Sequence, residues 1–382
     1  MKLVSLEPQR PTDKRRAFLV GLALSGQPGY LVEEHLDELA ELTRSAGVEV
    51  AGRALQFRKA PAPATFIGRG KVEELATAAG ELEADLVVFD GDLTPSQVKN
   101  LEEGLELQVM DRSGLILEIF HQRARTREAR TQVELAQLNY LLPRLTRRWR
   151  HLSRQVGGIG VRGGAGETQL EDDRRMLRKR IRRLGRDLEK IERTRKVQRR
   201  GRRGTELVAL AGYTNAGKST LFNRLTRAGV PVEDRLFATL DSRLRRGALD
   251  SGRTAIFSDT VGFIRKLPHH LVASFRSTLE EINRADLVLH VVDRSNARWE
   301  EQLEVAEKVL QDLGVDLDRA LPVFNKSDLL GEVVRRKGEA LWISAATGEG
   351  IDQLKREILR RLEALSEGAA ASDLPAPRKA TL

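Results

Sequence analysis

The sequence contains no cysteine and no long apolar run, and each absence removes a class of protein. Without Cys among its 382 residues, disulfide frameworks, thiolate metal sites and cysteine nucleophiles are excluded. No stretch approaches the roughly 18 consecutive apolar residues of a membrane-spanning helix, and the N-terminus lacks the pattern of a signal peptide. We therefore expect no membrane insertion and a cytoplasmic location.

What is present fits a folded chain of more than one domain. Hydrophobic residues make up 40% of the sequence, enough to build cores, which excludes wholesale disorder. At about 100 to 200 residues per domain, the length leaves room for about two or three domains.

Positive charge is concentrated in the middle of the chain. The net charge is +10, but Arg144 to Arg203 hold 22 basic and seven acidic residues, a local net charge of +15, so the remainder sums to −5. Such a concentration is typical of a polyanion partner, because each phosphate contact releases condensed counterions. The alternative is a solvated, Arg-rich helix face. The density and length of the segment favour nucleic acid.

Residues 1–111 are predicted to form an α/β domain, because short apolar runs alternate with amphipathic segments. This alternation is typical of strands in a mainly parallel sheet separated by helices. The expected strands cover residues 17–24, 48–57, 86–90 and 107–111, and the expected helices cover 32–46, 71–82 and a segment from Thr94.

Residues 112–203 are predicted to form a basic helical hairpin, because 113–145 and 167–200 both lack strand-like runs. The second helix carries the spacing of a coiled-coil seam, so the two helices are expected to pair: Leu177, Ile181, Leu184, Leu188 and Ile191. Between them, residues 155–169 contain six glycines and form a loop. That loop is either a plain hinge or, through Arg162, a contact to a phosphate backbone.

A phosphate-binding loop opens the third part, residues 204–366. A buried-strand run at 207–211 leads into the loop, and 220–226 is predicted to be a helix, which is the context that such a loop requires. Lys218 suits the β and γ phosphates, and Ser219 can place a hydroxyl on Mg²⁺. The predicted nucleotide-binding residues here are Gly212, Tyr213, Thr214, Asn215, Ala216, Gly217, Lys218, Ser219 and Thr220.

Further motifs follow in the order of a guanine-nucleotide domain. A carboxylate after the strand 254–258 can hold the metal, and a glycine three residues later can meet the γ phosphate: Asp259, Thr260, Val261 and Gly262. A segment between the loop and this carboxylate offers Thr239 as second hydroxyl ligand of Mg²⁺, or only a polar loop residue: Phe237, Ala238, Thr239, Leu240 and Asp241. The predicted metal ligands are Ser219, Thr239 and Asp259, and the predicted catalytic groups are Lys218, Thr239 and Gly262.

Base recognition is assigned to two later motifs. After the strand 321–324, the carboxylate of Asp328 suits the paired donors on the N1 and N2 edge of guanine, which adenine lacks. The motif comprises Asn325, Lys326, Ser327 and Asp328. Backbone N–H groups of a second motif can meet the guanine oxygen, although alone this motif would be an ordinary strand end: Ser344, Ala345 and Ala346.

Residues 206–346 resemble the Ras-like GTPase fold, which implies GTP and GDP as ligands and Mg²⁺ as cofactor. Many such GTPases carry a water-orienting Gln where this chain has Phe263, so we expect slow intrinsic hydrolysis completed by a partner. Asn215 resembles a loop Asn that coordinates a monovalent cation in some GTPases, which predicts stimulation by K⁺.

Motifs outside the GTPase domain show that the chain as a whole resembles the HflX family. The resemblance covers about residues 15–365 and rests on residues 66–71 (FIGRGK), 94–97 (TPSQ), 111–125 (DRSGLILEIFHQRAR), 132–145 (QVELAQLNYLLPRL) and 152–175. It implies a ribosome-associated GTPase that is stimulated by the large subunit, and that in some members splits or rescues stalled ribosomes. We expect the N-terminal and basic helical parts to bind the ribosomal RNA of that subunit. A GTP-regulated RNA-binding adaptor is the alternative.

Three smaller features complete the expectations. Gly68 to Lys71 forms either a phosphate cradle or a short tight turn. The basic helices lack the bulky apolar face of a membrane-surface element. Residues 367–382 are rich in Ala, Pro and Ser and are predicted to be disordered, and the chain is expected to be a monomer.

Overall fold

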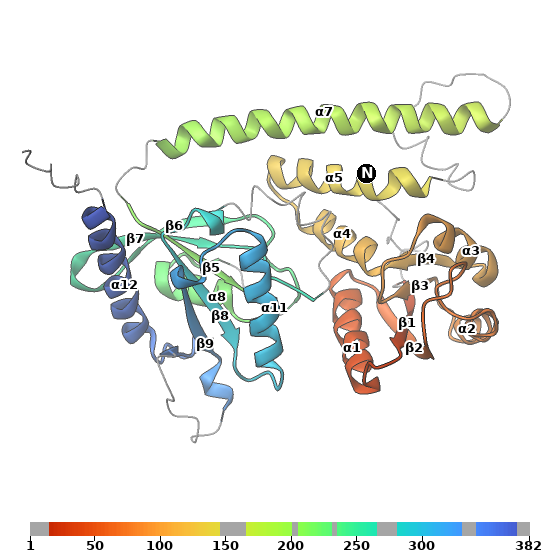
Figure 1. The fold of residues 1–382 in the computed structure, drawn as a ribbon, viewed down its shortest axis with the longest axis horizontal. Helices are drawn as coiled ribbons and strands as arrows, with labels where there is room; N and C mark the ends of the chain where they lie inside the picture. Colours follow the sequence, from red (N-terminus) through yellow and green to blue (C-terminus); the bar gives the residue numbers. More distant parts are fainter. Residues whose placement is uncertain are drawn as a thin grey trace, which may run out of the picture. The chain divides into compact units, whose positions relative to one another are not determined.

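The computed structural model describes residues 15–145, 166–200, 205–230, 235–265, 281–330 and 341–372. These residues divide into two compact units (Figure 1). The first unit contains the described residues up to Arg195 together with Arg235–Phe237, and the second contains the others. No helix within these ranges is long and apolar enough to cross a membrane.

The first unit is built on a four-stranded sheet of order β2-β1-β3-β4 in which every paired strand is parallel, as the alternation of segments predicts. Apolar residues of its strands and helices form one core that includes Phe18, Phe89 and Leu101. The strands are β1 (Arg16–Leu24), β2 (Glu49–Arg58), β3 (Leu86–Phe89) and β4 (Gln108–Asp111), and the connecting helices are α1 (Gly29–Ser45), α2 (Arg69–Glu81) and α3 (Pro95–Leu105).

The single long helix expected over residues 113–145 is wrong, because the chain forms α4 (Arg112–Arg123), α5 (Arg127–Leu141) and the 3-10 turn η1 (Leu142–Arg144). Ala124 leaves the helical region with φ −63° and ψ 111°. Thr126 then starts a new helix, since its hydroxyl accepts a hydrogen bond from the N–H of Ala129 at 3.1 Å. A local capping signal therefore divides the predicted helix.

The expected pairing of the two basic helices is confirmed for α5 and α7 (Gly166–Arg200), which run side by side in Figure 1. Leu177 and Leu184 of α7 share a buried cluster with Leu138 of α5. Arg180 adds a bidentate ion pair with Glu134, with N–O distances of 2.8 and 3.0 Å. The glycine-rich loop up to residue 165 lies outside the described residues, and its last four predicted positions, 166–169, belong to α7.

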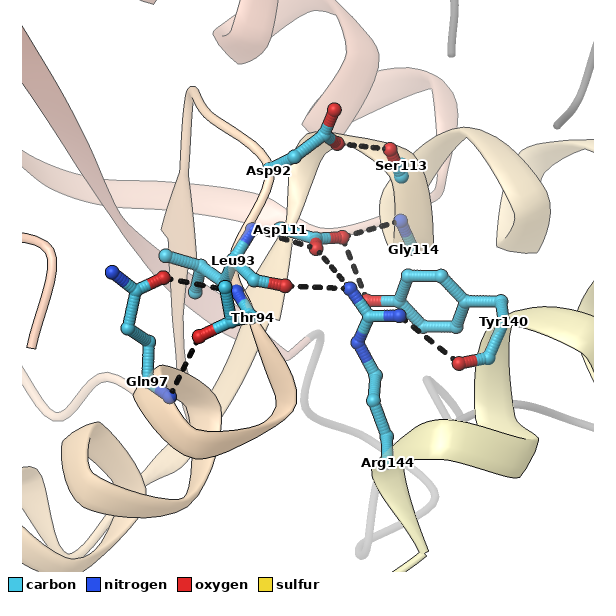
Figure 2. Close-up of polar contacts among 9 residues, drawn as sticks. All are labelled: Asp92, Leu93, Thr94, Gln97, Asp111, Ser113, Gly114, Tyr140 and Arg144. Atoms are coloured by element: carbon cyan, nitrogen blue, oxygen red, sulfur yellow. Dashed lines mark hydrogen bonds and ion pairs between the residues drawn. The ribbon is translucent and has the colours of Figure 1, made fainter. Parts of the chain in front are cut away.

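A buried polar cluster ties the start of α4 and the end of α5 to the sheet (Figure 2). Asp111, at the end of β4, is fully buried and accepts hydrogen bonds from the Tyr140 hydroxyl at 2.7 Å and from Arg144 at 3.0 Å. The N–H groups of Gly114 and Leu93 donate to the same carboxylate at 2.8 and 3.2 Å. The assignment of Arg144 to the polyanion-binding segment is therefore wrong, because its side chain is only 13% exposed and is paired with Asp111.

The second unit holds a six-stranded sheet of order β10-β9-β8-β5-β7-β6, in which only β6 is antiparallel to its neighbour. The strands are β5 (Leu207–Gly212), β6 (Arg243–Ala248), β7 (Thr254–Asp259), β8 (Leu287–Asp293), β9 (Ala320–Asn325) and β10 (Leu341–Trp342). The other elements are α8 (Lys218–Thr226), α11 (Trp299–Asp312), α12 (Ile351–Ser372), and the 3-10 turns η2 (Asp250–Gly252), η3 (Leu317–Arg319) and η4 (Ser327–Leu329).

The C-terminal end of this unit differs from the sequence prediction. Helix α12 continues to Ser372, so the disorder expected from residue 367 is wrong as far as 372, where an Ala-rich run favours helix. The prediction for residues 373–382 lies outside the described residues, and the domain boundaries at 111 and 203 remain a proposal.

Candidate functional site: a guanine-nucleotide site

The phosphate-binding loop turns sharply between β5 and α8, and its glycines are needed for that turn. Gly212 has φ 144°, and a Cβ there would lie 2.2 Å from the carbonyl oxygen of Val291. Gly217 has φ 91°, and a Cβ there would lie 2.2 Å from the Asn325 side chain. Asn215 supplies a further positive φ of 61°. The loop therefore packs against β8 and β9, and α8 begins directly after it.

Lys218 is the first residue of α8 and lies in the buried base of the loop. Its ammonium donates to the carbonyl oxygens of Gly212 and Tyr213 at 3.0 and 2.7 Å. Burial lowers the pKa of Lys218 to about 8, and the nearby carboxylate of Asp259 opposes part of that shift. The ammonium is thus held inside the loop, where phosphate oxygens are expected.

Three oxygen-bearing side chains that the sequence assigns to one metal come together from three segments. The Ser219 hydroxyl donates to Asp259 Oδ2 at 2.8 Å, and the Thr239 hydroxyl donates to the same oxygen at 3.1 Å. The two hydroxyl oxygens are 2.9 Å apart. The carboxylate is fully buried, and burial raises the pKa of Asp259, while these hydrogen bonds and the Lys218 charge oppose the rise.

The composition of this cluster suits Mg²⁺, a hard cation that prefers oxygen ligands. Asp259 Oδ1 is buried and has no hydrogen-bond partner among the described residues, so the second oxygen of the carboxylate remains available to a metal or to water bound to it. Within the described residues, no three acidic or His side chains gather into a metal site elsewhere. Ser219, Thr239 and Asp259 are therefore the residues that could hold the ion.

The segment after Asp259 lies directly against the phosphate-binding loop. A Cβ at Gly262 would lie 2.7 Å from the Thr214 side chain and 2.9 Å from Lys218 Nζ, so only glycine fits this position. Thr260 donates to the carbonyl oxygen of Leu210 at 2.6 Å. The backbone of Phe263 bonds to the loop on both sides, with Thr214 N–H donating to it at 2.7 Å and its own N–H donating to Gly212 at 3.0 Å.

The Phe263 ring is 1% exposed and, having no polar atom, cannot orient a water molecule. Val261 is likewise buried. In the segment before β6, Leu240 is buried and Ala238 and Asp241 are half-buried. Phe237 belongs to the first unit, in which its buried ring lies edge-on to Phe120 with ring centroids 4.7 Å apart. The structure thus gathers Thr239 with the metal cluster but places Phe237 in an apolar environment.

The two motifs assigned to the base are joined by Asn325. Its side-chain amide donates to the carbonyl oxygen of Ala216 at 2.9 Å, and its side-chain oxygen accepts from the N–H of Ala345 at 2.9 Å. This residue connects the phosphate-binding loop to the strand end after β10. Thr220, in the first turn of α8, is half-buried next to that loop.

The side chain that should read the base is open to solvent. Asp328 is exposed in η4. This turn begins directly after Lys326, which has φ 63° and an ion pair with Asp293 at 2.7 Å. The N–H of Ser327 donates to the carbonyl oxygen of Ile343 at 3.1 Å, which holds this motif beside the buried Ser344. Ala346 is exposed at the same strand end. The Asp328 carboxylate is thereby available to a base.

Tyr213, which the sequence assigns to the phosphate-binding loop, also accepts through its hydroxyl from the N–H of Arg265 at 3.0 Å. Two supporting residues were missed by sequence reasoning: Asp293 holds Lys326, and Arg224 donates to the carbonyl oxygens of Ala345 and Ala346. Both act across a large sequence separation and belong to no linear motif. Only the position of Asp293 at the end of an apolar strand run offered a signal.

A phosphate-binding loop before a helix, a carboxylate and hydroxyl cluster, and an Asn-Lys-Ser-Asp motif on a mainly parallel sheet define a P-loop GTPase. Comparison with protein families agrees. Residues 33–121 match the GTP-binding GTPase N-terminal family, 123–202 the GTP-binding GTPase middle region, and 207–326 the 50S ribosome-binding GTPase family.

Two relatives identify the family to which the chain belongs. GTPase HflX of Magnetococcus marinus is 53% identical over 332 residues, which cover 85% of this chain and 77% of that protein. GTPase HflX of Escherichia coli strain K12 is 49% identical over 339 residues, covering 86% and 79%. The chain belongs to the HflX family, and it is a GTP-hydrolysing enzyme of a ribosome-associated class.

Among solved structures, the crystal structure of SsGBP in a complex with GDP has a TM-score of 0.50 and 23% identity. It covers 92% of this chain and 99% of that chain. This likeness supports the fold alone, and it agrees with the predicted combination of an α/β domain, a helical part and a GTPase domain.

Proposed function

We propose that this GTPase binds the large ribosomal subunit and uses GTP hydrolysis in ribosome splitting, rescue or biogenesis. The observation that carries the proposal is the basic helix α7, which presents exposed cations on the face away from its seam with α5: Arg178, Lys179, Arg182, Arg183, Arg186, Lys190 and Arg193. Such a face suits the phosphates of ribosomal RNA. The protein would work as a monomer in the cytoplasm.

In the proposed reaction, water attacks the γ phosphate of GTP and releases GDP and phosphate. Lys218 would neutralise charge on the β and γ phosphates, and the Gly262 N–H would bond the γ phosphate. Ser219, Thr239 and Asp259 would hold Mg²⁺, which when bound supplies positive charge to the phosphate oxygens. Asp328 would accept from the N1 and N2 donors of guanine.

The chain offers no polar side chain at Phe263, so we infer slow turnover without a partner. The ribosome would complete the arrangement of the water. Phe263→Leu should leave ribosome-stimulated turnover largely unchanged, because an apolar side chain of similar volume preserves the packing. Loss of that turnover would show that the ring itself has a role in the reaction.

Comparing turnover in K⁺ and in Na⁺ tests whether Asn215 serves a monovalent cation.

The decisive measurement is GTP turnover with and without purified large subunits, at low and moderate salt. We expect strong stimulation that weakens with salt, because phosphate contacts are screened as counterions are added. Fast turnover without subunits, and no stimulation by them, would contradict the proposal.

A pair of charge variants tests the role of α7. Arg182→Glu with Arg186→Glu should weaken binding to the large subunit and flatten its salt dependence, by about 0.9 in log–log slope for each phosphate that is no longer neutralised. The matched control, Lys308→Glu with Arg356→Glu, reverses two exposed charges of the second unit. Equal effects from both pairs would indicate net charge alone.

The alternative is a GTP-regulated RNA-binding adaptor in which hydrolysis acts only as a timer. Sedimentation of whole ribosomes with the protein and GTP separates the two functions. Separated subunits support splitting, whereas intact ribosomes that carry the bound protein support the adaptor.

A further inference from the structure

Two aromatic side chains of the first unit are unusually exposed. Aromatic residues make up only 4% of the sequence, and among the described ones only Phe57 and Tyr30 are largely open to solvent, at 66% and 62%. Isolated exposed apolar residues are common, but two exposed aromatic residues at one end of a sheet form a candidate binding surface.

The two residues lie at one end of the parallel sheet. Phe57 is the penultimate residue of β2, and Tyr30 lies in the first turn of α1. The Phe57 ring lies 3.2 Å from the point where a Cβ of Gly29 would be, so the ring rests on the backbone directly before Tyr30. This is the carboxyl end of the strands, the edge at which α/β sheets bind their ligands.

The segment that follows Phe57 carries positive charge. Residues 56–71 contain four basic and no acidic residues, and residues 24–32 carry no charge. Lys59 and Arg69 are exposed, and the Arg58 guanidinium lies 2.7 Å from the position of a Cβ at Gly68. Neither α1 nor α2 has an acidic residue in its first turn. The first carboxylates along α1 are Glu33 and Glu34, one turn beyond Tyr30.

The combination of two ring faces with cations matches unpaired RNA better than a protein partner. Bases stack on aromatic faces while Lys and Arg contact the backbone, whereas paired bases in a duplex leave no face free for stacking. An apolar protein contact would need more apolar neighbours, but the residues next to Tyr30 and Phe57 in the sequence include Gly, Pro, Gln and basic side chains.

We propose that Tyr30 and Phe57, with Arg58, Lys59 and Arg69, form a platform that binds an unpaired segment of RNA by base stacking. The platform extends the proposed function, on which it rests, from phosphate contacts along α7 to recognition of single-stranded RNA by the first unit.

The test measures binding of a short, fluorescently labelled single-stranded RNA to the full chain by anisotropy. Salt is raised until electrostatic binding through α7 is weak, because stacking is less sensitive to salt than phosphate contacts are. Tyr30→Ala with Phe57→Ala should weaken binding about five- to hundredfold, the loss expected for one stacked base. Tyr30→Phe with Phe57→Tyr should restore it, because both rings remain.

Controls separate stacking from folding and from charge. Leu365→Ala removes a side chain that is 38% exposed in the second unit and should leave RNA binding unchanged. A duplex of the same sequence should bind the wild type and the Ala variant equally. Wild-type affinity of the Ala variant for single strands, or an equal loss with duplex, would overturn the platform.

Failure of the platform can be distinguished from failure of the proposed function. If large subunits stimulate the wild type but ring removal leaves single-strand affinity unchanged, only the platform is wrong. If large subunits do not stimulate the wild type, the proposed function is wrong, whatever the RNA affinities. A cross-link from photoactivated RNA to Tyr30 or Phe57 would give independent support.

Discussion

Asp111 and Asp259 each end a strand of one of the two sheets, and they differ in their hydrogen-bond partners. Each is the last residue of a parallel strand and is fully buried, and burial raises the pKa of each carboxyl group. Asp111 accepts from four protein donors (Figure 2). Within the part of the chain that the structure describes, Asp259 Oδ2 accepts from two hydroxyl groups and Oδ1 has no donor.

The difference indicates that the Asp111 carboxylate is structural, whereas the Asp259 carboxylate can bind a ligand. A buried charge is tolerable when opposite charge and hydrogen bonds satisfy it, as Arg144 and Tyr140 do for Asp111. Where the protein leaves a buried oxygen without a partner, a metal or its bound water can complete the set. Removal of each carboxylate should therefore affect different properties: catalysis at Asp259 and stability at Asp111.

Asp259→Asn should have the largest effect, a fall of about 10²- to 10³-fold in GTP turnover, because the group that anchors the metal is lost. The unfolding free energy of the nucleotide-free chain should change little, since the amide is isosteric and removes a buried charge. Steady-state turnover at saturating Mg²⁺ and urea unfolding provide the two measurements. Turnover close to that of the wild type would show that Asp259 does not hold the metal.

Asp111→Ala should have the opposite profile. It leaves the Arg144 charge and the Tyr140 hydroxyl without their buried partner, so we expect the unfolding free energy to fall by about 3 to 5 kcal/mol. GTP turnover per folded molecule should stay unchanged. Asp92→Ala is the matched control, because Asp92 is an exposed carboxylate on the same side of the sheet, bonded to Ser113. A similar loss in both variants would contradict a special role for the buried cluster.

The contrast between these two carboxylates also shows which features of a site can be predicted from the sequence. Ser219 and the Asp259 motif were found because a nucleotide site is built from short contiguous motifs with fixed chemistry. The Asp111 cluster was not found, since Leu93, Tyr140 and Arg144 reach it from separate segments. Arg144 was misassigned for the same reason, because a basic residue at the edge of a basic run gives no sign of a buried partner.

The fold shows the same limit. Periodicity located the four strands of the first sheet and strands β5, β7 and β9 of the second, but it merged α4 with α5, because the capping hydroxyl of Thr126 stands within a continuous amphipathic pattern. The antiparallel strand β6 was missed as well, since its sequence, Arg-Leu-Arg-Arg-Gly-Ala, carries too few apolar residues for a strand signal.

Tyr140→Phe tests the Asp111 cluster through the pH dependence of the unfolding free energy. Loss of the hydroxyl that donates to a charged group should cost about 1.5 to 3 kcal/mol at neutral pH. In the folded chain, burial and Asp111 raise the pKa of Tyr140 well above its ordinary value of 10. Above pH 10 the unfolded chain therefore binds fewer protons than the folded chain, and stability falls as pH rises.

In urea titrations from pH 8 to 11, the wild type should lose up to about 1.4 kcal/mol per pH unit above pH 10 from this residue. The variant should lack that contribution, so the two stability curves should converge. Parallel curves throughout this range would show that Tyr140 does not retain its proton in the folded chain.

Thr94→Ala should have the smallest effect, because it removes a cap that borders the Asp111 cluster without belonging to its charged centre. Thr94 accepts from the N–H of Gln97 at 3.3 Å, and the Gln97 side chain accepts from the N–H of Thr94 at 2.9 Å. Loss of one such cap costs about 1 kcal/mol, and Thr94→Ser should recover most of it, since the hydroxyl is kept. A loss as large as that of Asp111→Ala would mean that the start of α3 and the buried cluster unfold as one unit.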